Sequence, residues 1–221
     1  MSPRTLPPPD PAAPGPAPGW GVRRAARRSF PAPAALAADP AHAARLERFL
    51  SDLLRPYGLR PAPADGRGQS YGEMGEALIA DVVPPGEEVD LLVLAHAVPD
   101  LAPGRATACR LGHVCPGRPL ALAVTDESGP LGGAALRLLH AYAREGGLRR
   151  ALLLLLEQDR LPHRPDPPAH LPPASRGVAL LFGDPPPGGP PPAPAPPPPV
   201  GPGLDPWWSL AAPAHPAEDR P

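Results

Sequence analysis

Two stretches in the first part of the chain carry apolar residues at the spacing of an amphipathic helix. The first spans residues 39–58, where Asp39 can cap the helix and Gly58 can end it in a left-handed conformation. The second spans residues 68–85. The side chains expected to face inward are Leu46, Phe49, Leu50, Leu53 and Leu54 in the first helix, and Met74, Ala77, Leu78 and Val82 in the second.

Further along, continuous apolar runs of strand length alternate with helical patterns. Such runs are typical of parallel strands buried on both faces, and the alternation favours right-handed crossovers. We therefore expect an α/β fold with a mostly parallel sheet and covering helices. The expected strands are 89–98, 119–125, 149–158 and 176–184, with 20–30 as an arginine-containing edge strand, and the expected helices between them are 103–115 and 131–147.

Proline accounts for 43 of the 221 residues and is concentrated at the two ends of the chain. Because proline fixes φ and lacks the amide N–H, residues 1–18 and 185–221 are expected to be disordered or polyproline II. This leaves residues 19–184 as one domain. Within the C-terminal tail, Trp207, Trp208 and Leu210 stand as isolated apolar residues. They are either a short docking motif or part of a nonfunctional tail.

The formal net charge is −1, which argues against binding to nucleic acid or to a membrane surface. No apolar run is long enough to span a bilayer, and the N-terminus lacks the apolar segment of a signal peptide. Two cysteines do not make a disulfide framework. We therefore expect a cytoplasmic protein with reduced thiols and no cofactor.

A series of short motifs follows the predicted elements in order. They are Asp90, the Val98-Pro99-Asp100 turn, Thr107-Ala108, Leu111-Gly112, Ser128-Gly129, Gly146-Gly147, Glu157 and Gly177-Val178-Ala179. In this order and spacing, residues 68–184 resemble the N-terminal half of thiolase-fold condensing enzymes, and the nearest type is ketoacyl-ACP synthase III. The resemblance implies a single half of a thiolase-like fold, whose central helix is the one at 131–147.

The resemblance also shows what the chain lacks. The family's nucleophile is a cysteine at the start of the central helix, where the helix dipole favours the thiolate. If Ser128-Gly129 matches the family's Ser-Gly, Glu127 stands at the cysteine position. The family also uses His and Asn, or two His, from a second half. The sequence contains no asparagine and no second half, so decarboxylative condensation by this chain alone is not expected.

The turn at residues 126–131 leaves three candidate site residues with open alternatives. Glu127 is either a carboxylate in the acyl site or an acidic residue that interacts with the helix dipole. Ser128 is either an acyl-accepting nucleophile or a capping serine. His96, near the carboxyl end of a predicted strand, is either the base for Ser128 or a hydrogen-bonded polar group.

A metal site is a weaker hypothesis. Cys109, His113 and Cys115 form a C-x3-H-x-C pattern, but zinc sites normally need a fourth ligand and closer cysteine pairing. We expect no metal and interpret the cysteines as packing residues.

Three functions remain for the chain. The first is a non-catalytic accessory subunit in fatty-acid, polyketide or other secondary-metabolite biosynthesis. It would form a homodimer or a heterodimer with a ketosynthase, with an acyl carrier protein or acyl-CoA as a further partner. The apolar central helix supports this function, because a lone half would leave one face of that helix open. The second is a serine-dependent acyltransferase or hydrolase, and the third is a degenerate scaffold.

Overall fold

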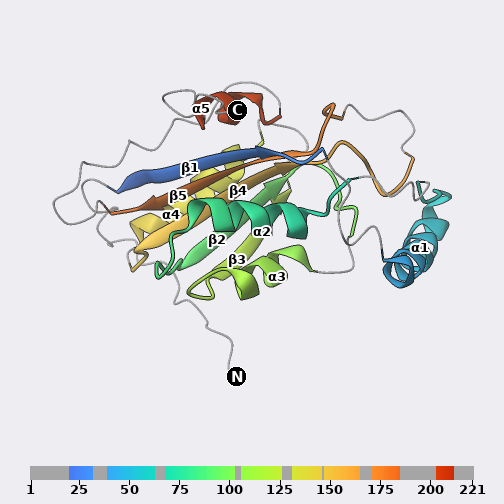
Figure 1. The fold of residues 1–221 in the computed structure, drawn as a ribbon, viewed down its shortest axis with the longest axis horizontal. Coiled ribbons are helices and arrows are strands. Elements are labelled where there is room, and N and C mark those ends of the chain that lie inside the picture. Colours follow the sequence, from blue (N-terminus) through green and yellow to red (C-terminus); the bar gives the residue numbers. More distant parts are fainter. Residues whose placement is uncertain are drawn as a thin grey trace, which may run out of the picture.

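The computed structural model describes residues 20–31, 39–62, 68–102, 106–125, 131–145, 147–164, 171–184 and 203–211. A five-stranded sheet in the order β1-β5-β4-β2-β3 forms its centre (Figure 1). The strands are β1 (Gly21–Ser29), β2 (Leu91–His96), β3 (Leu120–Thr125), β4 (Arg150–Glu157) and β5 (Arg176–Gly183). The helices are α1 (Pro40–Leu54), α2 (Tyr71–Val82), α3 (Thr107–Val114), α4 (Gly133–Arg144) and α5 (Asp205–Leu210), with a 3-10 turn η2 (Arg55–Tyr57) after α1.

The sheet confirms the α/β class and is mostly parallel, with one exception. Strand β2 pairs in parallel with both β3 and β4, whereas β5 is antiparallel to both β4 and β1. The mostly parallel sheet expected from the sequence is therefore confirmed, with β5 as its antiparallel member. No helix is found in the described parts of the β4–β5 connection, and a connection without a crossover helix suits antiparallel neighbours.

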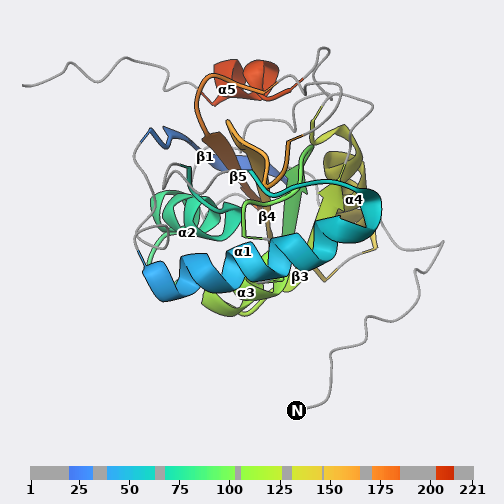
Figure 2. The same cartoon turned by 90° about the vertical axis from the view of Figure 1, so that its right-hand side faces the viewer.

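Apolar side chains on the two faces of the sheet build two separate cores. On β2, Leu92 and Leu94 pack with α2 and α3, whereas Leu91, Val93 and Ala95 pack with α4 and α5. All five are at most 1% exposed. Figure 2 shows α2 and α4 on opposite sides of the sheet. Helices thus cover both faces of the strands, as expected, and this explains the continuous apolar runs in the sequence.

Helix α2 forms as predicted, with its start fixed by a capping box. The Ser70 side chain accepts from the Glu73 backbone N–H, and the Glu73 side chain accepts from the Ser70 backbone N–H. Met74, Leu78 and Val82 are at most 1% exposed, which confirms the predicted inward face.

Helix α1 also forms, but only part of its apolar stripe is buried. Leu50 and Leu54 are buried, whereas Phe49 is 43% and Leu53 is 48% exposed. The expectation that the whole stripe faces inward is wrong. Figures 1 and 2 show the reason, because α1 lies at one end of the sheet rather than in either helical layer.

Strand β3 differs from the prediction in its burial. The continuous apolar run at 119–125 predicts a strand buried on both faces, but β3 is an edge strand whose residues are half-buried or exposed. Strand β1 is the other edge, as its arginines indicate. The sequence shows the apolar character of a strand, while its position in the sheet depends on the chain topology.

The C-terminal tail contains a packed helix, which corrects part of the prediction for residues 185–221. Trp207 and Leu204 are 0% exposed, and they join Phe182 and Leu180 of β5 in one core cluster. Pro206 is tolerated because it occupies the first turn of α5, where its missing N–H costs no hydrogen bond. Residues 1–19 and the rest of the tail lie outside the described residues, and the domain boundaries remain predictions.

Candidate site at the carboxyl ends of the parallel strands

His96 ends β2 at the point where the predicted turn of residues 126–131 begins. In the sheet register, His96 lies opposite Thr125 of β3 on one side and Leu156 of β4 on the other. Thr125 is the residue directly before that turn. Glu127 and Ser128 themselves fall outside the described residues, so their roles remain predictions. The topology nevertheless places His96 next to the end of β3, the strand that leads into Glu127 and Ser128.

The surroundings of His96 define which of its ring nitrogens is free to act. Nδ1 of His96 lies 3.0 Å from the carbonyl oxygen of Val98. Because a carbonyl oxygen only accepts, Nδ1 carries the proton and Nε2 holds the lone pair of the neutral ring. The ring also packs on Tyr71, with centroids 4.9 Å apart. This tautomer suits a proton acceptor or a hydrogen-bond acceptor at Nε2.

Burial lowers the pKa of His96, although the hydrogen bond to Val98 and the nearby Asp100 oppose the shift. The ring is therefore neutral at pH 7. Burial also raises the pKa of Tyr71, and Asp100 and Glu157 add to that shift. The phenol stays protonated and donates to the same Val98 carbonyl oxygen at 3.1 Å.

The lowered pKa of His96 predicts a dependence of stability on pH. Between the folded-state pKa and the ordinary value of 6.5, the unfolded chain binds more protons than the folded chain. The contribution to stability is therefore complete above about pH 6.5 and is lost as the pH falls toward the folded-state pKa. We expect an NMR titration midpoint for His96 below 6.5, and His96→Gln should reduce the stability lost on acidification. A titration midpoint at or above the ordinary value would contradict the burial of the His96 ring.

A buried carboxylate, Asp100, organises the loop that follows β2. Its Oδ1 accepts from the backbone N–H groups of Tyr71 and Ala102, each at 3.1 Å, and its Oδ2 accepts from the Thr107 hydroxyl at 2.7 Å. Gln158, 0% exposed, donates to Asp100 at 3.3 Å and to the Gln69 carbonyl oxygen at 2.6 Å. We call Tyr71, Asp100, Thr107 and Gln158 the polar hub.

The polar hub joins the start of α2, the start of α3 and the end of β4, so it fixes the loop that carries Val98 and orients His96. Sequence analysis marked Asp100 and Thr107 only as points of resemblance and did not mark Gln158. A polar residue directly after the leucine run of β4 is the one signal that could have indicated it. The hub supports the site and does not itself present a reactive group.

A second ionic cluster lies at the end of β4 beside α5. Arg176 binds Glu157 at 3.0 Å through Nε and pairs with Asp205 at 2.5 Å through Nη1. Its guanidinium also lies over the ring of Trp208, 5.9 Å from the centroid. The cluster links Glu157, one of the residues that carry the family resemblance, to helix α5. The carboxylate of Glu157 is therefore engaged in a contact that holds the fold together.

The start of α4, directly after residues 126–130, is held by Trp207. The indole Nε1 of Trp207 donates to the Leu131 carbonyl oxygen at 2.6 Å. Gly132 has φ +83°, and a Cβ there would meet Leu155 at 2.3 Å and the Trp207 ring at 3.4 Å. A glycine is therefore required at this point, since both the backbone angle and the space exclude a side chain.

The two cysteines lie in different environments, one on the surface of α3 and the other buried at its end. Burial raises the pKa of Cys115 to about 12, so its thiol stays protonated. Cys109 lies exposed on α3. Across the described residues there is no group of three or more His, Cys, Asp or Glu side chains that could hold a metal ion. In those same parts of the chain, no helix has the length and apolarity needed to cross a membrane.

Comparison with known proteins yields similarity to solved structures only. No family model matches the chain, and no curated protein matches it. AbyA1, a tetronic acid condensing enzyme, is 23% identical, with a TM-score of 0.41, over 73% of this chain and 54% of that chain. An HMG-CoA synthase solved in complex with CoA is 12% identical, with a TM-score of 0.42, over 75% of this chain and 42% of that chain. The chain thus spans about half the length of the solved structures that it matches, and these likenesses assign no reaction to it.

Proposed function

We propose that this chain is a thiolase-like partner subunit that does not itself catalyse condensation. It acts in the cytoplasm, in fatty-acid, polyketide or other secondary-metabolite biosynthesis, by pairing with a second thiolase-like subunit. The single observation that carries the pairing is the contrast between the two edges of the sheet. One edge is protected by charge, and the other is left uncharged.

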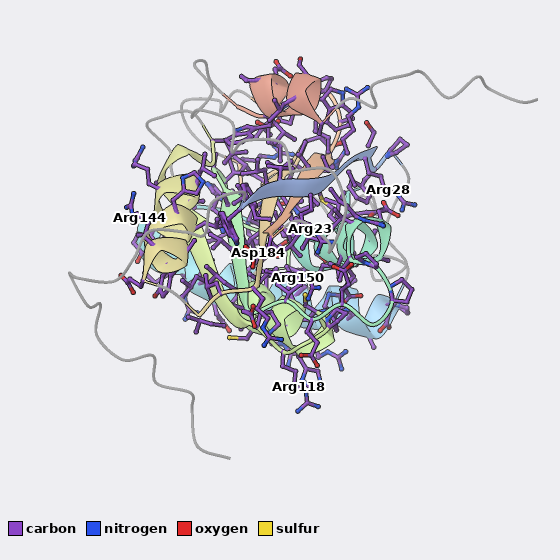
Figure 3. All side chains as sticks on the ribbon, turned by 90° about the vertical axis from the view of Figure 1, so that its left-hand side faces the viewer. Arg23, Arg28, Arg118, Arg144, Arg150 and Asp184 are labelled. Carbon is purple, nitrogen blue, oxygen red and sulfur yellow. The ribbon has the colours of Figure 1, made fainter. Side chains whose placement is uncertain are left out.

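Strand β1 is the protected edge. It carries four arginines, and its register with β5 shifts between Val22 and Arg24. Arg23 pairs with Glu87 at 3.0 Å and Arg28 with Asp81 at 3.4 Å. Figure 3 shows Arg23 and Arg28 spaced along this strand. Charged side chains and irregular register are the usual means by which an edge strand avoids pairing with another chain.

Strand β3 has none of these protections. Its sequence LALAVT contains no charge and no proline, and its register with β2 is unbroken. Within the described residues, β2 is its only strand partner. Leu120, Leu122 and Val124 are half-buried beside α4. A regular apolar edge of this kind favours β-strand addition by a partner.

The outer face of α4 adds a second surface next to this edge. Ala134, Leu138 and Ala141 are half-exposed there. Arg137 and Arg144 are exposed beside them, and Figure 3 shows Arg144 pointing away from the helix. The sequence predicted an open apolar face on this helix, and small residues on such a face allow a partner helix to approach closely.

A charge on β3 is expected to abolish the pairing. Ala123 is exposed on this strand, so Ala123→Lys places a charge on the edge without disturbing the core. We expect the unmodified chain to elute as a dimer, or as a heterodimer with a co-expressed ketosynthase, in size-exclusion chromatography with light scattering. Ala123→Lys should fail to retain the ketosynthase, and its dimer fraction should be smaller than that of the unmodified chain.

The matched control is Ala25→Lys, since Ala25 is exposed on the already cationic edge β1. It should leave the assembly unchanged. A monomeric wild-type chain at every concentration, with no ketosynthase retained, would refute the proposal.

The register of His96 with Thr125 favours one alternative function, a serine-dependent acyltransferase or hydrolase. Ser128 would attack the thioester carbonyl carbon of an acyl carrier protein or acyl-CoA while Nε2 of His96 takes the hydroxyl proton. The C–S bond would then break, and His96 would pass the proton to the departing thiolate of the carrier. Intact-mass measurement after incubation with an acyl-CoA distinguishes the two functions. An adduct that Ser128→Ala removes supports the enzyme, whereas no adduct together with a retained ketosynthase supports the partner subunit.

A further inference from the structure

The segment 203–211, which contains α5, packs on the apolar face of β5. Leu204, Trp207 and Ala211 pack in one cluster with Val178, Leu180 and Phe182 of β5. Apart from Ala211, which is 6% exposed, these residues are at most 1% exposed. Figure 1 shows α5 beside β1 and β5. Without this segment, a large apolar area of β5 would face water.

The docked segment is held by a small set of specific contacts. Trp207 donates to the Leu131 carbonyl oxygen, and Arg27 donates to the Trp208 carbonyl oxygen at 2.8 Å. Arg27 also lies over the Trp208 ring, 5.2 Å from the centroid, and Arg176 pairs with Asp205. These contacts form a complete binding surface for a segment of nine residues, whichever copy of the chain supplies it.

The connection between β5 and this segment is longer than the distance that it must cover. Strand β5 ends at Gly183, yet Asp205 contacts Arg176, the first residue of β5. The gap is therefore about the length of the strand, roughly 23 Å at 3.3 Å per residue. Of the nineteen residues from Asp184 to Pro202, twelve are proline. A polyproline II stretch of that length extends about 60 Å.

A connection whose polyproline II length would be more than twice the required span lowers the effective concentration of the segment at its own surface. The same length allows the segment to reach an identical surface on another molecule, and such exchange is a low-cost route to a dimer. We propose that α5 is exchanged between two copies of this chain. The segment 203–211 of each copy docks on β5 and α4 of the other copy. This interface lies over β5, which β4 and β2 separate from the β3 edge, and it does not depend on the proposed function.

A complementary cross-linking experiment tests the exchange in the full chain. Both samples carry Cys109→Ser, which removes the exposed thiol, while Cys115 is buried. One copy then carries Asp205→Cys and the other Arg176→Cys. A short bismaleimide joins them across copies only if α5 of one copy docks on the other. The two variants are mixed, unfolded and refolded together, once at about 5 µM and once at about 300 µM. This range is chosen to include low effective concentrations of the segment at its own docking surface.

We expect a covalent dimer in the mixture, several-fold more abundant at the higher concentration and absent from either variant alone. The double variant Asp205→Cys/Arg176→Cys, diluted, is the control and should give an intrachain cross-link without dimer. If the double variant cross-links within the chain but the concentrated mixture gives no dimer, α5 docks only on its own chain.

A second measurement needs no change at the docking surface. Deleting residues 190–199 leaves a connection of about 28 Å, which matches the span on the chain's own sheet. In the Ala123→Lys background, light scattering after refolding should show several-fold less dimer for the deletion than for the full-length tail. Equal dimer fractions would overturn the exchange. Ala123→Lys removes the β3 contact from both samples. Any difference in dimer fraction between them therefore reports the exchange of α5 alone.

Discussion

Replacing Trp207 by alanine is expected to lower the free energy of unfolding by about 3–5 kcal/mol. The side chain is 0% exposed, and its ring packs against Gly132 and the apolar face of β5. The substitution leaves a cavity and also removes the donor to the Leu131 carbonyl oxygen. For a chain of this length, the loss corresponds to a fall in Tm on the order of 10 °C. Urea unfolding followed by circular dichroism measures it.

Two control substitutions separate the contributions of Trp207. Trp207→Phe keeps most of the ring but cannot donate to Leu131, and we expect about 1–3 kcal/mol of destabilisation. Trp208→Ala removes a half-exposed ring and leaves the Trp208 carbonyl oxygen that Arg27 binds. Its cost should be about 1 kcal/mol, the range of an exposed cation–π contact. If Trp207→Ala unfolds at the wild-type urea concentration, α5 is not part of the core.

Replacing Asp100 by alanine is the second substitution with a large expected effect. The carboxylate accepts from four donors, two of which are the backbone N–H groups of Tyr71, at the start of α2, and of Ala102. The side chain is 8% exposed, so water cannot freely replace it. Leaving buried donors without an acceptor costs about 1–3 kcal/mol for each group, and we expect a total loss of roughly 2–4 kcal/mol.

The controls for Asp100 keep its shape or remove one partner. Asp100→Asn retains an oxygen for the backbone groups but loses the charge, so its cost should lie between those of wild type and alanine. Thr107→Val removes only the 2.7 Å hydroxyl contact, at a cost of about 1–2 kcal/mol. The His96 NMR signal gives a second readout, because Asp100→Ala should shift it through the loop that carries Val98. An unchanged His96 signal would show that the polar hub does not position His96.

Much of the secondary structure follows from the sequence because it depends on local periodicity. The inward face of Met74, Leu78 and Val82 in α2 forms as expected. The capping box at Ser70 and Glu73 was not predicted, although it is also a local feature of this helix. The apolar runs of β2 and β4 likewise become strands covered on both sides. These elements can be predicted from the local sequence pattern because that pattern depends on residues that are close together in the chain.

The candidate site was only partly predictable. The position of His96 at a strand end indicated a polar group at the carboxyl edge of the sheet, and the structure places it there beside Thr125. Its tautomer could not be predicted, because it depends on the carbonyl oxygen of Val98 and on the loop fixed by Asp100 and Gln158. These partners are distant in sequence, and no periodic pattern connects them.

The sequence by itself determined an α/β fold, its five strands and the helices α1 to α4. Only the tertiary structure decided that β5 runs antiparallel, that β3 is an open edge, and that Trp207 is buried. Each of these depends on contacts between segments far apart in the chain. Trp207, for example, meets Leu131 across 76 residues. An apolar residue in a proline-rich tail has no local partner, so its burial becomes visible only when the surface that receives it has formed.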